Sequence, residues 1–159
     1  MKHSKGLIMG KFMPLHKGHM AMIDFALSQV DNLTILVVAN PTDQIHGLKR
    51  LGWIREMYED NNRIKVELME NTLPHDGTYR EEDVLEWCEY IKKRFPDIKA
   101  FISSESYGDI LADYMHIEHL VYDTKRVHKP ISSTMIRKDP EKHQHHLPEH
   151  VVRDYVKGK

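Results

Sequence analysis

A continuous run of apolar and largely β-branched residues, "LTILVVA" at positions 33–39, constrains the fold of this chain more than any other feature. Strands that are buried on both faces have this composition, whereas strands with one face in water alternate between apolar and polar residues. A shorter apolar run at residues 7–9 precedes it, and the intervening segment 19–30 places its apolar residues at helical spacing. The order strand, helix, strand predicts a β-α-β unit with two parallel strands.

The same alternation continues along the chain. Helical periodicity covers residues 48–60, 80–95 and 106–115, and strand patterns cover residues 63–69, 98–103 and 118–122. A serine-capped helical turn at 132–140 and a last helix over about 148–157 follow. We therefore expect an α/β fold in which helices cover both faces of a parallel sheet. Residues 1–159 are expected to form a single domain, because domains cluster around ~100–150 residues.

Composition excludes several classes of protein. The chain is 40% hydrophobic and 30% charged, which is ordinary for a globular protein. Its formal net charge of -1 gives no reason to expect a nucleic acid or an anionic membrane as partner. Its one cysteine, Cys88, fits a reducing compartment, and no apolar run approaches the ~18 residues of a membrane span. We expect a cytoplasmic protein.

The segment "MGKFMPLHKGHM", residues 9–20, lies where the first strand ends and the next helix begins. Helix starts carry unpaired backbone N–H groups and the positive end of the dipole, so they bind phosphate. His16 and His19 would donate N–H bonds to phosphate oxygens there. The spacing alone equally allows His16 to be a helix cap and His19 to face solvent.

A second motif lies far downstream, in "PISSTMIR" at residues 130–137. The hydroxyl groups of Ser132, Ser133 and Thr134 can bind phosphate oxygens, and Arg137 supplies a forked cationic donor. The alternative is a plain N-cap with a solvated arginine.

Together these stretches resemble the nucleotidyltransferase superfamily that carries HxGH or TxGH after its first strand. "GKFMPLHKGH" is most similar to the adenylyltransferase domain of bifunctional nicotinamide-nucleotide adenylyltransferase/ribosylnicotinamide kinases. "SSESYGDILADYM" at 103–115 resembles another segment of that family, and "YDTKR" resembles its Asp-x-x-Arg, which selects Asp123 and Arg126. The chain stops about where the Walker motif of the kinase would be expected, so the resemblance implies a stand-alone adenylyltransferase with a Rossmann-like fold.

The resemblance implies that the 5′-phosphate of nicotinamide mononucleotide attacks the α-phosphorus of ATP, giving NAD and pyrophosphate. Mg²⁺ would be held mainly by the ATP phosphates, with no metal ligand from protein side chains. The catalytic residues it implies are Lys11, His16, His19 and Arg137. The ATP-binding residues it implies are Gly10, Lys11, Phe12, His16, Gly18, His19, Ser132, Ser133, Thr134 and Arg137. For the mononucleotide it selects Trp87, Lys11, Asp123 and Arg126.

Several of these assignments have a structural alternative. Trp87 would stack on the cationic nicotinamide ring, or it belongs to the core of its helix. Trp53 is a second candidate for stacking and Arg50 for phosphate or adenine, although packing and a solvated helix face suit them better. Cys88 is expected to be a small core residue.

Other functions remain open from the sequence. A different nucleotidyltransferase of the same superfamily would act on another phosphorylated acceptor, and a regulatory module would bind NAD or ATP without turnover. A cluster of histidines, His143, His145, His146 and His150, would suit metal binding, but it lacks zinc-finger spacing. The choice between nicotinamide and nicotinate mononucleotides and the formation of a homo-oligomer also stay open.

Overall fold

Five parallel strands form one sheet in the computed structural model, which describes residues 3–70, 81–105, 107–122 and 131–158, with Glu81 described by its backbone alone. The strands are β1 (His3–Gly10), β2 (Val30–Ala39), β3 (Ile64–Glu70), β4 (Ala100–Ser103) and β5 (Glu118–Val121). Their order across the sheet is β3-β2-β1-β4-β5. The parallel sheet expected from the sequence is confirmed.

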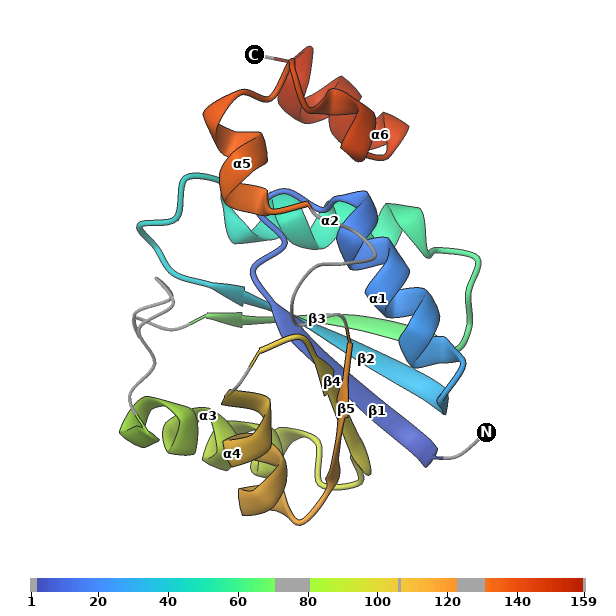
Figure 1. Ribbon diagram of the computed structural model, residues 1–159, viewed down its shortest axis with the longest axis vertical. Coiled ribbons are helices and arrows are strands. Elements are labelled where there is room, and N and C mark those ends of the chain that lie inside the picture. Colours follow the sequence, from blue (N-terminus) through green and yellow to red (C-terminus); the bar gives the residue numbers. More distant parts are fainter. Residues whose placement is uncertain (1–2, 71–80, 106, 123–130, 159) are drawn as a thin grey trace.

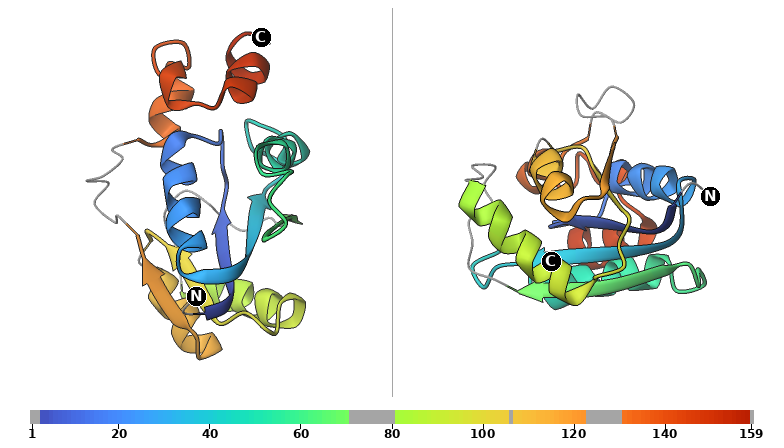
Figure 2. Two further views of the ribbon diagram at one scale, coloured as in Figure 1. Left: turned by 90° about the vertical axis from the view of Figure 1, so that its right-hand side faces the viewer. Right: turned by 90° about the horizontal axis from the view of Figure 1, so that it is seen from below.

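Helices cover both faces of this sheet (Figure 1). Helices α1 (Lys17–Leu27) and α2 (Gly47–Met57) pack on one face, and α3 (Glu81–Arg94) and α4 (Tyr107–Met115) pack on the other, as a second view confirms (Figure 2). The central strands β1 and β2 are therefore enclosed from both sides, which explains the unbroken apolar run at 33–39. None of the helices within the described ranges is long and apolar enough to cross a membrane.

The C-terminal segment packs beside α1 and α2. It contains α5 (Ser133–Lys138), a 3₁₀ turn (Gln144–His146) and α6 (Glu149–Val151), which continues as a π-helical turn over Val152–Val156. The last helix expected over 148–157 is therefore present, but it widens after its first turn. Trp53 of α2 holds it in place, since the indole Nε1–H donates to Asp154 Oδ2 at 3.2 Å and its ring meets Tyr155 edge-on. Trp53 is a packing residue, as its helical position predicted.

The strand order places a topological switch point between β1 and β4. From β1 the chain proceeds outward through β2 to β3, and it then returns to the other side of β1 with β4. Crossovers that leave such a point in opposite directions open a crevice at the carboxyl ends of the strands, where α/β proteins bind their ligands. Gly10 ends β1 and Ser103 ends β4, so these two residues mark the position expected for a site.

Candidate active site

A cavity of about 200 Å³ lies at this switch point. Its lining contains Met9, Gly10, Lys11, Phe12, His16, Gly18, His19, Met22, Val38, Trp87, Ser103, Ser104, Glu105, Tyr107, Tyr122 and Ser133. One end consists of the β1–α1 connection with Ser133. The other end, which we call the aromatic end, contains Trp87, Tyr107 and Tyr122 beside Ser103 and Glu105. The cavity thus joins a phosphate-type helix start to an aromatic surface.

The two histidines of the first motif cap α1. His16 is the N-cap, and its Nδ1 accepts hydrogen bonds from the backbone N–H groups of Gly18 and His19 at 3.1 and 3.3 Å. His19 completes the reciprocal arrangement, because its Nδ1 accepts the N–H of His16 at 3.1 Å. The two rings stack with their centroids 3.7 Å apart. The capping role that the spacing allowed for His16 is confirmed, and His19 lines the cavity and takes part in the cap.

These caps determine the tautomer of both rings. A nitrogen that accepts a backbone N–H bond carries no proton, so the proton of each neutral imidazole lies on Nε2. Both histidines therefore act as donors through Nε2, and both line the cavity. Capping and phosphate binding are compatible, because they use different nitrogens of the same ring.

Gly18 is required by this arrangement. A Cβ atom at position 18 would lie 2.9 Å from His16 Cε1 and 3.0 Å from its Nδ1. Contacts this short do not occur between packed atoms, so any side chain would displace the ring that caps the helix. The glycine between the two histidines makes room for the first of them.

Helix α5 joins the second motif to the first. Arg137 donates to the carbonyl oxygen of Met13 at 2.7 Å, and Ser133 donates to that of Pro14 at 3.3 Å. Ser132 is the N-cap of α5 and accepts the Met135 N–H at 3.1 Å. The two segments that are far apart in the sequence thus meet at the phosphate-type end of the cavity. Of the residues in the second motif, Ser133 lines the cavity. Ser132, Thr134 and Arg137 are not among its lining residues and make hydrogen bonds within the surrounding protein.

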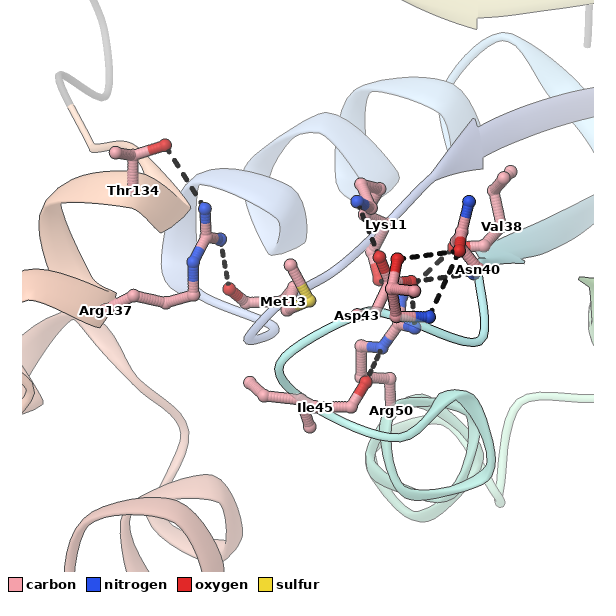
Figure 3. A network of polar contacts seen from close by, with 10 residues as sticks. Lys11, Met13, Val38, Asn40, Asp43, Ile45, Arg50, Thr134 and Arg137 are labelled. Carbon is pink, nitrogen blue, oxygen red and sulfur yellow. Dashed lines mark hydrogen bonds and ion pairs between the residues drawn. The ribbon is translucent and has the colours of Figure 1, made fainter. Parts of the chain in front are cut away.

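Lys11 belongs to a buried ionic network at the same edge of the sheet (Figure 3). Its Nζ lies 2.9 Å from Asp43 Oδ1, and Arg50 Nη2 lies 2.7 Å from Asp43 Oδ2. Arg50 also donates to three carbonyl oxygens, those of Lys11, Val38 and Ile45. Because Arg50 has no exposed surface, the prediction of a solvated arginine, or of one available to phosphate or adenine, was wrong.

The protonation of this network follows from its contacts. Burial raises the pKa of the Asp43 carboxyl, but the Asn40 N–H, the Lys11 ammonium and the Arg50 charge outweigh it and hold that pKa below its usual range. Burial also lowers the pKa of Arg50, and the Asp43 charge opposes that change. The helical pattern around Arg50 could not reveal this role, because its partners come from three other segments of the chain.

Trp87 is a core residue, and it also lies where the predicted stacking on a nicotinamide ring would require it. It is 3% exposed and packs in the core between α3, α4 and the sheet, with its ring edge-on to Tyr107 at 5.6 Å. It also lines the aromatic end of the cavity. Cys88 beside it is a buried thiol whose pKa burial raises to about 11, which confirms the inert core residue that was expected.

A chain of three polar side chains lies behind the aromatic end, and sequence reasoning missed it. Ser103 Oγ lies 2.7 Å from His119 Nε2, and His119 Nδ1 lies 2.8 Å from Asp109 Oδ1. Gly108 makes room for it, since a Cβ there would lie 2.3 Å from His119 Nε2. Ser103 and Gly108 belong to the "SSESYG" segment that carried the resemblance, but only the fold brings His119 of β5 to them.

Some predicted residues cannot be placed. Asp123 and Arg126, the remaining candidates for the mononucleotide, lie outside the described residues. His150 Nε2 donates to the Trp53 carbonyl oxygen at 2.8 Å, so it serves the packing of α6. Among the described residues no group of three or more His, Cys, Asp or Glu could hold a metal ion.

Comparison with known proteins gives this chain a family. The model of the cytidylyltransferase-like family matches residues 7–139. That range contains the second half of β1, the other four strands of the sheet, both motifs and every described lining residue of the cavity.

Two individual relatives are similar to nearly the whole of this chain. The trifunctional NAD biosynthesis/regulator protein NadR of Escherichia coli (strain K12) is 30% identical, over 98% of this chain and 42% of that protein. A protein named "Probable nicotinate-nucleotide adenylyltransferase" from a Nitratiruptor species is 27% identical, over 93% of this chain and 94% of that protein. The chain therefore spans less than half of the first relative and nearly the whole of the second.

A solved structure supports the fold. A crystal structure of NadR in complex with NAD and AMP-PNP superimposes with a TM-score of 0.75 at 23% identity. The match covers 96% of this chain and 46% of that one. The Rossmann-like nucleotidyltransferase fold that the motifs implied is thereby confirmed.

Proposed function

The chain belongs to the cytidylyltransferase-like family, and from that premise we propose that it transfers the adenylyl group of ATP to nicotinamide mononucleotide. The observation that carries this proposal is the pair of stacked histidines at the start of α1, both lining the cavity as Nε2–H donors. Such donors suit an α-phosphate that gains charge in a transition state. The relatives named for NAD biosynthesis and nicotinate-nucleotide adenylyl transfer support a pyridine mononucleotide as acceptor.

The reaction is a direct displacement. An oxygen of the 5′-phosphate of the mononucleotide forms a bond to the α-phosphorus of ATP, and the bond from that phosphorus to the β-phosphate oxygen breaks. The products are NAD and pyrophosphate, which takes the electron pair of the broken bond. The substrate phosphate is itself the nucleophile, so the protein contributes alignment and charge stabilisation.

Each part of the cavity has a role in this scheme. His16 and His19 donate to the α-phosphate oxygens as negative charge develops on them. Lys11, whose side chain is 29% exposed beside Asp43, adds a positive charge at the same end. Ser133 at the start of α5 would turn its hydroxyl from the Pro14 carbonyl oxygen to the departing pyrophosphate, with Ser132, Thr134 and Arg137 next to it.

A divalent metal ion, for which we propose Mg²⁺, would accompany ATP. Among the described lining residues, the phosphate-type end of the cavity presents lysine, histidine and serine side chains and no carboxylate, which is the side chain that Mg²⁺ prefers. This donor set fits a metal held by the phosphates and water, and the metal would neutralise part of the polyphosphate charge. The buried thiol of Cys88 fits the cytoplasmic location that we also propose.

The test is pyrophosphate release by the purified protein with ATP and Mg²⁺. Nicotinamide and nicotinate mononucleotides and 4′-phosphopantetheine are offered as acceptors, the last because two phosphopantetheine adenylyltransferases are also relatives. We expect turnover with a pyridine mononucleotide. Turnover with 4′-phosphopantetheine alone would assign another acceptor, and ATP binding without any turnover would indicate a sensing module.

A further inference from the structure

The aromatic end of the cavity bears on the choice between nicotinamide and nicotinate mononucleotides, which the proposed function leaves open. Nicotinamide mononucleotide ends in a carboxamide, whose NH₂ group donates hydrogen bonds, whereas nicotinate mononucleotide ends in a carboxylate, which only accepts them. Relatives of this chain carry names from both NAD biosynthesis and nicotinate-nucleotide chemistry. Trp87 at this end is the residue predicted to stack on the pyridine ring, so we place the ring and its substituent here, and the polarity of the neighbouring groups then decides between the two acceptors.

Ser103 is the buried polar side chain at this position. It is 3% exposed, it ends β4, and it lines the cavity. Its Oγ accepts the backbone N–H of Glu105 at 3.3 Å. A hydroxyl has one proton and two lone pairs, so the direction of the proton determines whether Ser103 offers the cavity a donor or an acceptor.

His119 and Asp109 determine that direction. Asp109 accepts from His119 Nδ1 at 2.8 Å, which places the proton of the neutral ring on Nδ1 and leaves Nε2 as an acceptor. Ser103 then donates its only proton to Nε2 at 2.7 Å, a much shorter contact than its alternative acceptor, the Glu105 carbonyl oxygen at 3.3 Å. The oxygen of Ser103 is left with a lone pair for the cavity.

From this geometry we propose that Ser103 selects the carboxamide of nicotinamide mononucleotide over the carboxylate of nicotinate mononucleotide, with His119 and Asp109 as positioning residues. This inference rests on the proposed function. The lone pair of Ser103 accepts from the carboxamide NH₂ and repels a carboxylate. Glu105 lines the same end and adds a second oxygen acceptor. Its negative charge attracts the cationic pyridinium ring and opposes a second carboxylate beside it.

The first experiment compares kcat/KM for the two mononucleotides in the wild-type protein at saturating ATP and Mg²⁺. We expect the amide to be preferred by roughly 100-fold or more, because a site built around a hydrogen bond rejects the analogue that cannot make it. Preference for the acid would overturn the inference and leave adenylyl transfer standing. Absence of turnover with either would overturn the proposed function, and the inference with it.

Two variants separate selection from packing. Ser103→Ala should lower kcat/KM for the amide roughly tenfold without lowering kcat/KM for the acid, and the KM for ATP should stay unchanged. His119→Leu removes the acceptor that holds the Ser103 proton, so the hydroxyl is no longer held as an acceptor toward the cavity and the preference for the amide should fall. If these residues had a purely structural role, kcat/KM would fall for both mononucleotides together, and that result would overturn the inference.

A third variant tests Asp109, the last of the three hydrogen-bonded side chains, without disturbing the core. Asp109 has a side chain that is 76% exposed, so Asp109→Ala should fold normally. It should reduce the preference for the amide in the same direction as His119→Leu. Asp113→Ala, on the exposed surface of the same helix, is the matched control and should leave the preference unchanged. Equal preference in the Asp109 variant and the wild type would remove Asp109 from the proposal.

Discussion

The histidine pair at the start of α1 shows how a backbone contact sets the chemistry of a side chain. Each Nδ1 accepts a backbone N–H, and the two rings stack 3.7 Å apart. A second proton on either ring would break a cap bond and place a positive charge against both the other ring and the helix dipole. In this arrangement each neutral ring carries its proton on Nε2, where it can donate to charge that develops in the transition state.

His19→Ala tests this role. The proposed donor to the α-phosphate is lost, so kcat should fall about 100–1,000-fold with little change in ATP binding, measured by steady-state kinetics and calorimetry. Loss of the cap bond should cost about 1 kcal/mol of stability. The control is His46→Ala: His46 caps α2 through Nδ1 at 3.2 Å but is not a lining residue of the cavity. Near wild-type turnover in the His19 variant would leave it as a cap only.

Trp87 requires a test that separates packing in the core from stacking on a ligand in the cavity. Trp87→Ala should lower the free energy of unfolding by about 3–5 kcal/mol, because the side chain is almost fully buried. If the ring also stacks on the nicotinamide, Trp87→Phe should keep the fold and raise the KM for the mononucleotide more than that for ATP. Urea unfolding and separate Michaelis constants provide the measurements. A uniform loss for both substrates would assign Trp87 to the core alone.

At the scale of elements, α1 depends on a glycine for its first turn. Gly18→Ala places a Cβ 2.9 Å from the capping ring of His16, so the ring must move away from the position that holds the cap. We expect both the melting temperature and kcat to fall. Gly52→Ala is the matched control, because its Cβ meets nothing within 4 Å on α2. That change should raise the free energy of unfolding by up to about 1 kcal/mol. Similar effects of both changes would contradict the packing argument.

The sequence predicted the helices and strands better than it predicted the contacts between them. Within the described residues the five strands and the α-helices, the last taken with its π-helical turn, were predicted with ends that differ by up to about four residues, because buried parallel strands and amphipathic helices have distinct periodicities, whereas the 3₁₀ turn at Gln144–His146 was not predicted. Motifs at helix starts also identified most of the phosphate-type end of the cavity. Arg50 and His119 were missed, because their roles depend on partners from distant segments. A charged residue on an apparently amphipathic helix gives no sign that three carbonyl oxygens and a carboxylate surround it.

At the scale of the whole molecule, the Lys11–Asp43–Arg50 network ties together the segments that form one edge of the cavity. Arg50 of α2 binds the ends of β1 and β2 through the carbonyl oxygens of Lys11 and Val38, and Asp43 connects both cations (Figure 3). The network therefore fixes the backbone from which Lys11 reaches the cavity. Loss of this network should lower the stability of the fold more than it slows any single step of the reaction.

Asp43→Asn tests this network through the pH dependence of stability. The folded pKa of Asp43 lies below its usual value, whereas the unfolded chain returns it to ~3.9. The stabilisation by the charged carboxylate is therefore complete above about pH 5 and is lost as the pH falls below ~4 and through the folded pKa. At pH 7 the variant should be about 3 kcal/mol less stable, because buried Arg50 loses its counterion. The gap between the two proteins should narrow steadily as the pH falls from 5 to 3, measured by urea unfolding.

Asp97→Asn is the control for Asp43→Asn. It removes an exposed carboxyl whose pKa is lowered by its hydrogen bond with Lys5, and it should change stability little at any pH, since solvent screens that pair. A gap that stays constant from pH 7 to pH 3 would show that Asp43 acts through its shape and hydrogen bonds, and not through its charge.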